Sequence, residues 1–459
     1  MAIPSFDSYV TPGVYVGEDV QPVVSDMSTA QTVVALIGEA VGYQIITEEM
    51  QLTSAQWASG STSGASVTGM SVISVTSGTA ISSGSSTSGY VAQVTNGYIN
   101  VKPAVDGFLE GERIWVTYRY VSSGYYQVQS FTDYDDIRTM YGEPWTSGGI
   151  NSNVSLAAWL AMTNGAKEIM ICAVQTSAVA DYEAALNLLT NEEANVVIPV
   201  TGNSSVHSSV QNHVDGQSLL NHERIAIVGR DSSSTAITTK TLQQAAASFN
   251  DSRVILVSPA SINIFNRESN AVLEVGSQYV AAALSGMLAA RAVQIPLTRK
   301  RIYGFDSMAE KRTETDKVNE GRSGVLCYED YKGIIRIRHS VTTKQNANDN
   351  TREVNVIRAK DWMMTSLREN VDVMIGEIIT DDTIQNLKTL VAGTLERLKA
   401  NSAINAYANL KARQPSDRPT VIEVKFEVKP TYGLNYILIG FSINTQTGSI
   451  TQTYVGSQF

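Results

Sequence analysis

The sequence predicts a multidomain α/β (α+β) protein whose central domain is built on a mainly parallel βαβ sheet. Three observations support this prediction. Apolar runs of strand length alternate with helix-length segments between about residues 131 and 297. A Ser/Thr/Gly-rich segment precedes this alternation, and apolar and charged residues alternate strictly near the C-terminus. Because 459 residues are too many for one typical core, we expect an inserted all-β domain, a C-terminal α+β domain, and extended N- and C-terminal arms as well.

Residues 1–24 are predicted to form the N-terminal arm. Its key stretch is Thr11–Glu18, which reads Thr-Pro-Gly-Val-Tyr-Val-Gly-Glu. Pro12 restricts the backbone to an extended conformation, and Val14–Val16 are strand formers. A short terminal strand is not stable alone in water, so it must pair with another strand. That partner is either an edge of its own domain or the sheet of a neighbouring subunit.

The sheet domain is expected to comprise residues 25–45 and 131–297, with an insertion between them. Thr32–Gly38 is a continuous apolar run that suits a buried strand. Residues 50–101 contain no charged side chain, and short strand-like runs interrupt their Ser, Thr and Gly residues. We therefore predict a small outward-facing β domain over residues 46–130; a disordered linker is the alternative.

Four strands separated by helices are predicted for the second part of the sheet domain. This alternation is typical of βαβ units and a parallel sheet. Val280–Leu297 is interrupted by polar residues, so we expect a buried helix there and no membrane span. The strands are predicted at 168–174, 195–200, 224–229 and 253–258, and the helices at about 181–189, 205–220, 238–249 and 277–291.

The C-terminal α+β domain is predicted over residues 298–443. It should contain a strand at 334–338, an amphipathic helix at 354–370 and a second helix from Thr383. We expect the second helix to continue or restart through 403–412 and to stop before Pro415. Four basic residues without an acid lie near its end: Arg397, Lys399, Lys411 and Arg413. They either complement the helix dipole or form a docking face for an acidic partner.

The clearest strand pattern lies close to the C-terminus. Ile422, Val424, Phe426 and Val428 alternate with charged residues, and residues 436–443 resemble a returning strand. We predict a hairpin with one buried face, followed by a C-terminal arm over residues 444–459. Such an edge requires a partner strand.

Motifs for catalysis or for cofactor binding are not found. The sequence lacks GxGxxG after a strand, GxxxxGK[ST], GxSxG and HExxH, so we predict no enzyme, no cofactor and no catalytic residues. The histidines match no common zinc spacing and are expected to be solvent-exposed, and Cys172 is expected to be inert core. Asp135-Asp136 and Asp381-Asp382 are expected at helix starts. The four histidines are His207, His213, His222 and His339.

The net charge of −10 is unevenly distributed. The first 101 residues contain seven acidic residues and no lysine or arginine, whereas residues 291–360 contain fifteen basic and nine acidic residues. This asymmetry suggests that the two ends of the chain face different partners. The basic stretch contains acids and lacks interleaved stacking aromatics, so we do not expect nucleic acid to be a partner.

Several of these segments occur together in one order. Pro12–Val16 opens the chain, Val341–Thr343 follows a strand, and Asn355–Arg358 begins a helix. A helix is expected to end before Pro415, and Ile439–Ile443 closes the hairpin. This order resembles the contractile-tail sheath proteins of bacteriophages and the sheaths of related contractile injection particles.

The resemblance implies a mechanical function without catalysis. Subunits of that family stack as six-membered rings in a helix around a tail tube, and they contract to drive the tube through the bacterial envelope. The implied partners are further copies of the chain, the tube protein, and baseplate and terminator proteins, with no nucleic acid and no direct membrane insertion. The implied location is the virion, after assembly in the host cytoplasm. Arms of neighbouring subunits would complete a β-sheet with the C-terminal hairpin.

Candidate assembly residues follow from this resemblance. The expected inter-subunit N-terminal arm comprises Pro12, Gly13, Val14, Tyr15, Val16 and Glu18. The expected C-terminal hairpin and arm comprise Val424, Phe426, Val428, Ile437, Ile439, Phe441, Ile443, Ile450 and Tyr454. The expected tube-facing residues are Arg397, Lys399, Lys411 and Arg413. Three alternatives stay open: the sheath of a bacterial injection particle, a nucleotide-binding α/β enzyme, and an adhesin or shell protein.

Overall fold

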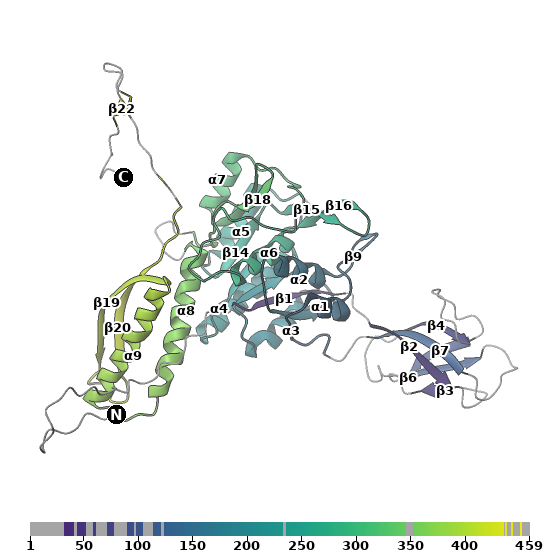
Figure 1. The fold of residues 1–459 in the computed structure, drawn as a ribbon, viewed down its shortest axis with the longest axis horizontal. Coiled ribbons are helices and arrows are strands. Elements are labelled where there is room, and N and C mark those ends of the chain that lie inside the picture. Colours follow the sequence, from purple (N-terminus) through teal and green to yellow (C-terminus); the bar gives the residue numbers. More distant parts are fainter. Residues whose placement is uncertain are drawn as a thin grey trace, which may run out of the picture.

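The structure of the chain is a computed structural model with a mixed α/β architecture (Figure 1). It describes residues 32–40, 44–51, 58–60, 71–77, 90–95, 98–103, 113–120, 124–232, 236–345, 352–435, 437, 442–443 and 450–451. The predicted mixed α/β fold with a mainly parallel central sheet is confirmed. The N-terminal arm residues, from Pro12 to Glu18, lie outside the described residues.

The central sheet has eight strands in the order β18-β17-β14-β13-β12-β1-β11-β8. All pairs from β17 to β11 are parallel, and the two outermost pairs are antiparallel. The early apolar run forms an interior strand, because Val34 pairs with both Ile169 and Val196. The strands are β1 (Val34–Glu39), β8 (Gln129–Phe131), β11 (Ile169–Val174), β12 (Val196–Pro199), β13 (Ile225–Gly229), β14 (Val254–Ser258), β17 (Val325–Tyr331) and β18 (Ile334–Ile337).

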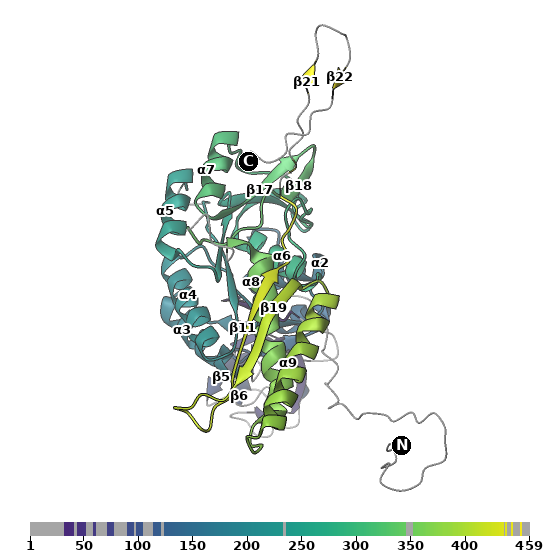
Figure 2. The same cartoon turned by 90° about the vertical axis from the view of Figure 1, so that its left-hand side faces the viewer.

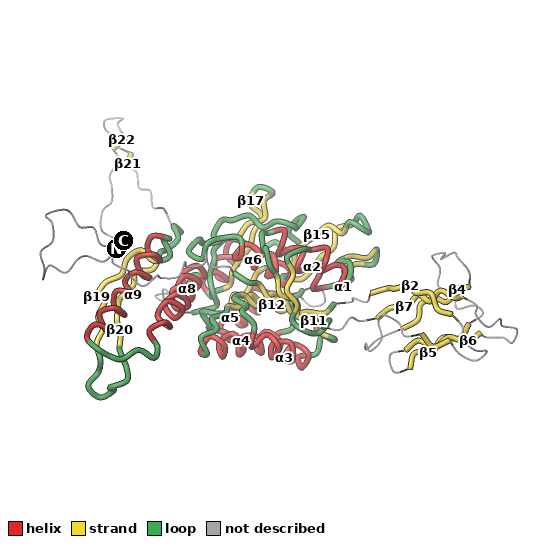
Figure 3. The backbone as a smooth tube through the Cα atoms, turned by 60° about the horizontal axis from the view of Figure 1, so that its bottom comes forward, coloured by secondary structure: helices red, strands yellow, loops and turns green. Residues whose placement is uncertain are grey.

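Helices cover both faces of this sheet (Figures 1 and 3). Successive residues of β1 contribute to different cores: Leu36 packs with α1, α2 and α6, whereas Ile37 packs with α3, α4 and α5. A strand buried on both faces must be apolar throughout, which is why this run is continuous. The helices are α1 (Tyr134–Tyr141), α2 (Asn153–Thr163), α3 (Val179–Leu188), η1 (Leu189–Asn191), α4 (Ser204–Leu219), α5 (Thr239–Phe249), α6 (Gln278–Ala289) and α7 (Glu314–Arg322).

The four predicted βαβ helices are confirmed by α3 to α6. Helix α6 is buried along its whole length and crosses α2 closely. A Cβ atom on Gly286 would lie 2.0 Å from the carbonyl oxygen of Ala161, so only glycine allows this approach. No helix within the described ranges is long and apolar enough to cross a membrane.

Residues 44–120 contribute two antiparallel three-stranded sheets, β2-β7-β4 and β3-β6-β5. Figure 1 shows them at the end of the molecule opposite α9. The strand-like runs recognised in this segment are therefore strands. They are β2 (Gln44–Gln51), β3 (Ala58–Gly60), β4 (Ser71–Ser77), β5 (Tyr90–Thr95), β6 (Tyr98–Pro103) and β7 (Arg113–Tyr120).

The C-terminal part contains α8 (Val354–Val371), η3 (Asp372–Met374), α9 (Asp381–Ala400), β19 (Ile404–Arg413) and β20 (Glu423–Pro430). The two helices confirm the predictions, but the helix predicted through 403–412 is wrong, because these residues form β19. Register shifts in β19 place its partly buried apolar residues three apart, at Ile404, Tyr407 and Leu410. This spacing imitates one face of a helix.

The predicted hairpin between residues 422–428 and 436–443 is also wrong. Strand β20 pairs with β19, and the short strand β21 (Ser442–Ile443) pairs with β22 (Ile450–Thr451). Because residues 404–413 form the strand β19, they pair with β20 in place of residues 436–443. Two smaller antiparallel pairs complete the described elements: β9 (Trp145–Thr146) with β10 (Gly149–Ile150), and β15 (Ser261–Asn266) with β16 (Ala271–Gly276).

Candidate assembly surface

Helix α9 carries the β19–β20 hairpin on its apolar face (Figure 3). Thr380 caps its N-terminus by accepting a hydrogen bond from the backbone N–H of Thr383, and the predicted acids Asp381 and Asp382 occupy its first turn. Leu387, Val391, Leu395 and Leu398 follow each other at helical spacing along one face of this helix, and all four are buried. The helix therefore provides a rigid base for the two strands.

The inner face of the hairpin packs on this helix. Val424, Phe426 and Val428 of β20 are half-buried against the cluster formed by α9. The residues between them point outward, since successive strand residues alternate between faces. The three predicted hairpin residues thus anchor the strand within the subunit, and they leave its backbone edge and outer face for contact.

Two free edges remain on this hairpin. Strands β19 and β20 form a two-stranded sheet, so neither outer edge pairs with a strand of the described residues. β19 has register shifts at Ile404/Ala406 and Ala408/Lys411, and Asn409 has a φ of 58°. Such irregularities disrupt strand addition, so β20 presents the more regular edge. A two-stranded sheet is only marginally stable by itself, and further strands would stabilise it.

The outer face of the hairpin carries charged residues. Lys411 lies directly opposite Lys425, and like charges in this position destabilise a strand pair. Glu423 accepts from Arg413 at 3.1 Å and also pairs with Arg418. The hydrogen bond from Arg413 is the main reason that the pKa of Glu423 lies below its usual value. Lys425 reaches the same carboxylate at 3.6 Å.

The four predicted tube-facing residues do not form one face. Arg397 and Lys399 lie in the last turn of α9, and Lys399 pairs with Glu396 at 3.6 Å. Lys411 and Arg413 lie at the far end of β19, which begins just after that helix. A strand rises about 3.3 Å per residue, so the two pairs are separated by most of the strand length.

The other predicted assembly residues are only partly described. Ile437 is exposed, and Ile443 pairs with Ile450 between β21 and β22. Ile439, Phe441 and Tyr454 lie outside the described residues, as do the six residues of the N-terminal arm. The structure therefore brings together the three β20 members of the predicted set and, separately, Ile443 with Ile450.

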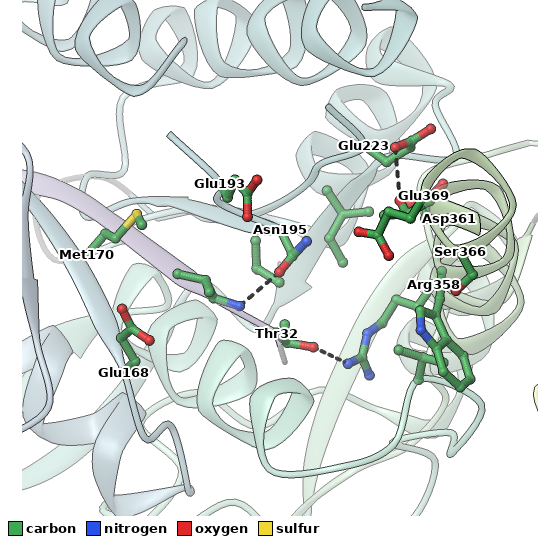
Figure 4. A pocket seen from close by; sticks show the side chains of 16 residues that line it. Thr32, Glu168, Met170, Glu193, Asn195, Glu223, Arg358, Asp361, Ser366 and Glu369 are labelled. Carbon is green, nitrogen blue, oxygen red and sulfur yellow. Dashed lines mark hydrogen bonds between the residues drawn. The ribbon is translucent and has the colours of Figure 1, made fainter. Parts of the chain in front are cut away.

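Helix α8 joins this C-terminal unit to the central sheet. A pocket of about 430 Å³ lies between α8 and the amino ends of β1, β11, β12 and β13 (Figure 4). Arg253 donates two hydrogen bonds to Asp361 of α8, at 2.9 and 3.0 Å. Arg368 of α8 also pairs with Glu223, through one nitrogen and one carboxylate oxygen. These two pairs fix α8 to the loops that begin the strands.

A buried arginine adds to this joint. Arg358 of α8 donates to the hydroxyl oxygen of Thr32 and to the carbonyl oxygen of Leu288, both at 2.8 Å (Figure 4). Burial lowers its pKa to about 10, so the group is still charged at neutral pH. Thr32 immediately precedes β1, so this contact ties α8 to the root of the N-terminal segment. The sequence analysis did not identify the joint residues, because their partners lie far away along the chain.

Within the described residues of the sheet domain, the pocket at α8 does not lie where nucleotides usually bind. Ligands of open α/β sheets bind outside the carboxyl ends of the strands, whereas the pocket at α8 lies at the amino ends. At the carboxyl end of β13, a Cβ atom on Gly229 would lie 2.2 Å from the backbone of Ser277 and Gln278. The start of α6 therefore packs directly on this strand and leaves no space for a phosphate.

The prediction of solvent-exposed histidines is wrong in part, whereas the prediction of a buried Cys172 is confirmed. His207 is fully buried, so the expectation of solvent-exposed histidines is wrong at this position. Its Nε2 lies 2.8 Å from the carbonyl oxygen of Thr201, and burial lowers its pKa to about 4. Cys172 is buried as predicted, and burial raises its pKa to about 12. No group of three potential metal ligands occurs within the ranges that the structure describes.

Comparison with known proteins identifies relatives. The chain is 38% identical over 356 residues to the tail sheath protein of Mycobacterium phage Bxz1, which covers 76% of the chain and 61% of that protein. It is 25% identical over 279 residues to the tail sheath protein of Staphylococcus phage Twort, which covers 58% of the chain and 45% of that protein. The chain thus spans about half to three fifths of the length of these relatives. No family model matches the sequence.

Solved structures show the same fold. The contracted helical sheath of the anti-feeding prophage matches with a TM-score of 0.61 at 12% identity, over 95% of this chain and all of that chain. The contracted sheath complex of the extracellular contractile injection system PVC matches with a TM-score of 0.55 at 13% identity, over 70% of this chain and 87% of that chain.

Proposed function

We propose that the chain belongs with the tail sheath proteins of bacteriophages and is the structural subunit of a contractile tail sheath. In this role it polymerises as six-membered rings stacked in a helix around a tail tube. Contraction of the polymer drives the tube through the bacterial envelope. The subunit is a virion component assembled in the host cytoplasm, and its function is mechanical and not enzymatic.

The observation that carries this proposal is the β19–β20 hairpin with its free edges. A strand added to the regular edge of β20 would satisfy backbone groups that have no strand partner in the described part of the chain. We propose that residues 10–18 and 436–455 of neighbouring subunits supply such strands. About five backbone hydrogen bonds per strand, each contributing roughly 0.5–1.5 kcal/mol net, would keep neighbours connected while other contacts rearrange.

The joint at α8 supports a mechanical function. Its ion pairs and the buried Arg358 fix the hairpin-bearing unit to the central sheet. A pull on the hairpin would therefore move the whole sheet domain as a rigid body, which is an established class of switching motion.

The remaining assignments follow the same proposal. The insertion 46–130 is an outward-facing β domain, and 1–24 and 444–459 are the arms. The boundary predicted at residue 298 is wrong, because β17 and β18 belong to the central sheet, so the C-terminal domain begins after β18. The tube contacts the basic residues Arg397, Lys399, Lys411 and Arg413, and baseplate and terminator proteins contact the ends of the polymer. The alternative assembly is the sheath of a bacterial injection particle, which the fold of the anti-feeding prophage sheath favours.

Deletion of residues 1–20 tests the proposal. We expect a folded protein that no longer forms tubes, because the arm that reaches the neighbouring hairpin is missing. The control removes residues 233–235, which lie between β13 and α5 in the sequence, and should still polymerise. Electron microscopy and circular dichroism measure assembly and folding. Tubes of normal form from the 1–20 deletion would refute the role of the arm.

A further inference from the structure

The turn between α8 and α9 exposes apolar side chains within an acidic segment. Val373, Ile375 and Ile378 are 68%, 79% and 80% exposed, which is unusual for three neighbouring aliphatic residues. Residues 369–387 contain no lysine or arginine. We call this segment the acidic tip, and its acidic residues are Glu369, Asp372, Glu377, Asp381 and Asp382.

The backbone of the acidic tip is held in place. Met374 packs against the α9 cluster, and the hydroxyl of Thr383 donates to the carbonyl oxygen of Ile378 at 2.7 Å. The apolar side chains therefore point to solvent from an ordered support, and burying them against a partner would cost little conformational entropy of the backbone.

A second exposed surface lies on the outer side of β17 and β18. The segment 299–302 runs beside β18, with Arg301 bridged to Arg336 in antiparallel register. This register places Tyr303 opposite Ile334, which in turn lies opposite Tyr331 of β17. All of these positions share one face, because strand residues two apart point to the same side.

This surface combines arginine with exposed aromatic and aliphatic groups. Tyr303, Tyr331 and Ile334 are all exposed. The guanidinium of Arg336 lies 3.6 Å from the ring centroid of Tyr331, and that of Arg301 lies 4.8 Å from the ring centroid of Tyr303. Arginine and tyrosine are enriched at the centres of protein interfaces. We call this surface the cationic face.

The cationic face has positive charge available for a partner. Its one buried carboxylate, Glu329, is already neutralised by Arg299, Arg336 and neighbouring cations. Lys300, Arg301 and Lys332 are exposed, and none has a carboxylate partner within the described ranges. The acidic tip and the cationic face are thus complementary in charge, and both present apolar groups.

The two surfaces are far apart on the molecule. Figures 1 and 2 both show α9 low in the view and β18 high in it. The acidic tip therefore cannot reach the cationic face of its own chain. Contact between two copies would be heterologous, and heterologous contacts generate rings or helical filaments.

We propose that the acidic tip of one subunit docks on the cationic face of a second copy of this chain. Val373, Ile375 and Ile378 contact Tyr303, Tyr331 and Ile334, and the acidic residues pair with Arg301, Lys332 and Lys300. This contact rests on the proposed polymerisation but uses neither arm. It is a second connection between subunits, and its strength depends on ionic strength because it joins exposed charges.

Charge reversal tests the contact. The variant Asp381→Lys/Asp382→Lys should raise the protein concentration needed for polymerisation at least tenfold, and Arg301→Glu/Lys332→Glu should do the same. Combining both pairs of substitutions should restore polymerisation. The control Asp135→Lys/Asp136→Lys changes the same charges in the first turn of α1 and should leave assembly unchanged. Equal assembly of the tip variant and this control would refute the contact.

Crosslinking tests the geometry independently of tube formation. A chain with Ile378→Cys and Ile334→Cys should form a ladder of disulfide-linked multimers under a mild oxidant, whereas a mixture of the two single variants should stop at dimers. The native cysteines are buried and should give little background. Ile378→Cys with Val272→Cys, on exposed β16, is the control. If the parent chain forms no tubes but the ladder appears, the proposed function fails and the contact stands; tubes without a ladder refute the contact alone.

Discussion

Removal of the Asp361 carboxylate should loosen the joint between α8 and the central sheet. Arg253 and Asp361 share two hydrogen bonds of 2.9 and 3.0 Å, and both side chains are only 14% exposed. In the variant Asp361→Ala, the guanidinium would retain only the carbonyl oxygen of Arg224, at 3.1 Å. Breaking one partner of a buried pair costs about 3–5 kcal/mol, and the residual exposure argues for about 3 kcal/mol here.

Replacing both partners of this pair should cost little stability. Burial raises the pKa of Asp361, because the cost of taking its charge out of water exceeds the stabilisation by Arg253. The free energy of unfolding of the double variant Arg253→Met/Asp361→Leu should therefore lie within about 1 kcal/mol of that of the parent chain. The single variants Arg253→Met and Asp361→Leu complete a mutant cycle with this double variant, and the coupling energy should be about 2 kcal/mol or more.

Urea unfolding followed by tryptophan fluorescence measures these changes, since Trp362 adjoins Asp361 on α8. The matched control is Glu143→Ala, which removes a pair between exposed side chains, 3.2 Å from Arg138. It should cost less than about 1 kcal/mol. If Asp361→Ala costs no more than Glu143→Ala, α8 is not fixed to the sheet by this pair, and the reasoning about the joint is wrong.

Three further predictions concern stability. Leu395→Ala should lower the free energy of unfolding by about 2–5 kcal/mol in urea titrations, since this fully buried residue lies at the centre of the α9 cluster; a cost below about 1 kcal/mol would contradict that packing. Gly286→Ala should destabilise the chain by at least about 1–3 kcal/mol because its Cβ would collide with the backbone of α2, whereas Gly216→Ala, in open space on α4, should be neutral or stabilising in the same thermal melts. Burial lowers the pKa of both His207 and His213 to about 4, from about 6.5 in the unfolded chain. The free energy of unfolding should therefore be constant above pH 6.5 and fall as the pH drops towards 4, by up to about 3 kcal/mol for His207. The variant His207→Gln should flatten this profile.

The central sheet could be predicted from the sequence because its signals are local. A parallel strand that is covered on both faces must be apolar throughout, and the run at residues 34–39 and the four later runs meet this condition without reference to any other part of the chain. Their order in the sheet is not local. That β1 lies between β11 and β12 follows only from the way the helices pack on both faces.

The hairpin shows why the candidate site was only partly predictable. β20 was recognised from its strict alternation, but its partner was not, because two register shifts in β19 disturb the period of two. Asn409, with its positive φ, marks one of these shifts, and its position within an alanine-rich segment gives no signal of a strand. The basic residues were consequently assigned to one helical face, although they lie on two elements.

The α8 joint was missed for a different reason. Arg253 and Asp361 lie 108 positions apart, and each taken alone is an ordinary charged residue. Neither spacing nor composition shows that two such residues will meet; only the placement of α8 across the amino ends of the strands does. Similarly, the exposed side chains of the acidic tip look like core residues until the turn between α8 and α9 is placed.

The central claim is that subunits polymerise by adding strands to the β19–β20 hairpin. The most direct measurement is a helical reconstruction by electron cryomicroscopy of tubes formed by the full chain. We predict hollow helical tubes in which strands from neighbouring subunits extend the hairpin, with the added strand on the regular edge of β20. Tubes in which this sheet stays two-stranded, or a full chain that remains monomeric at all concentrations, would contradict the claim.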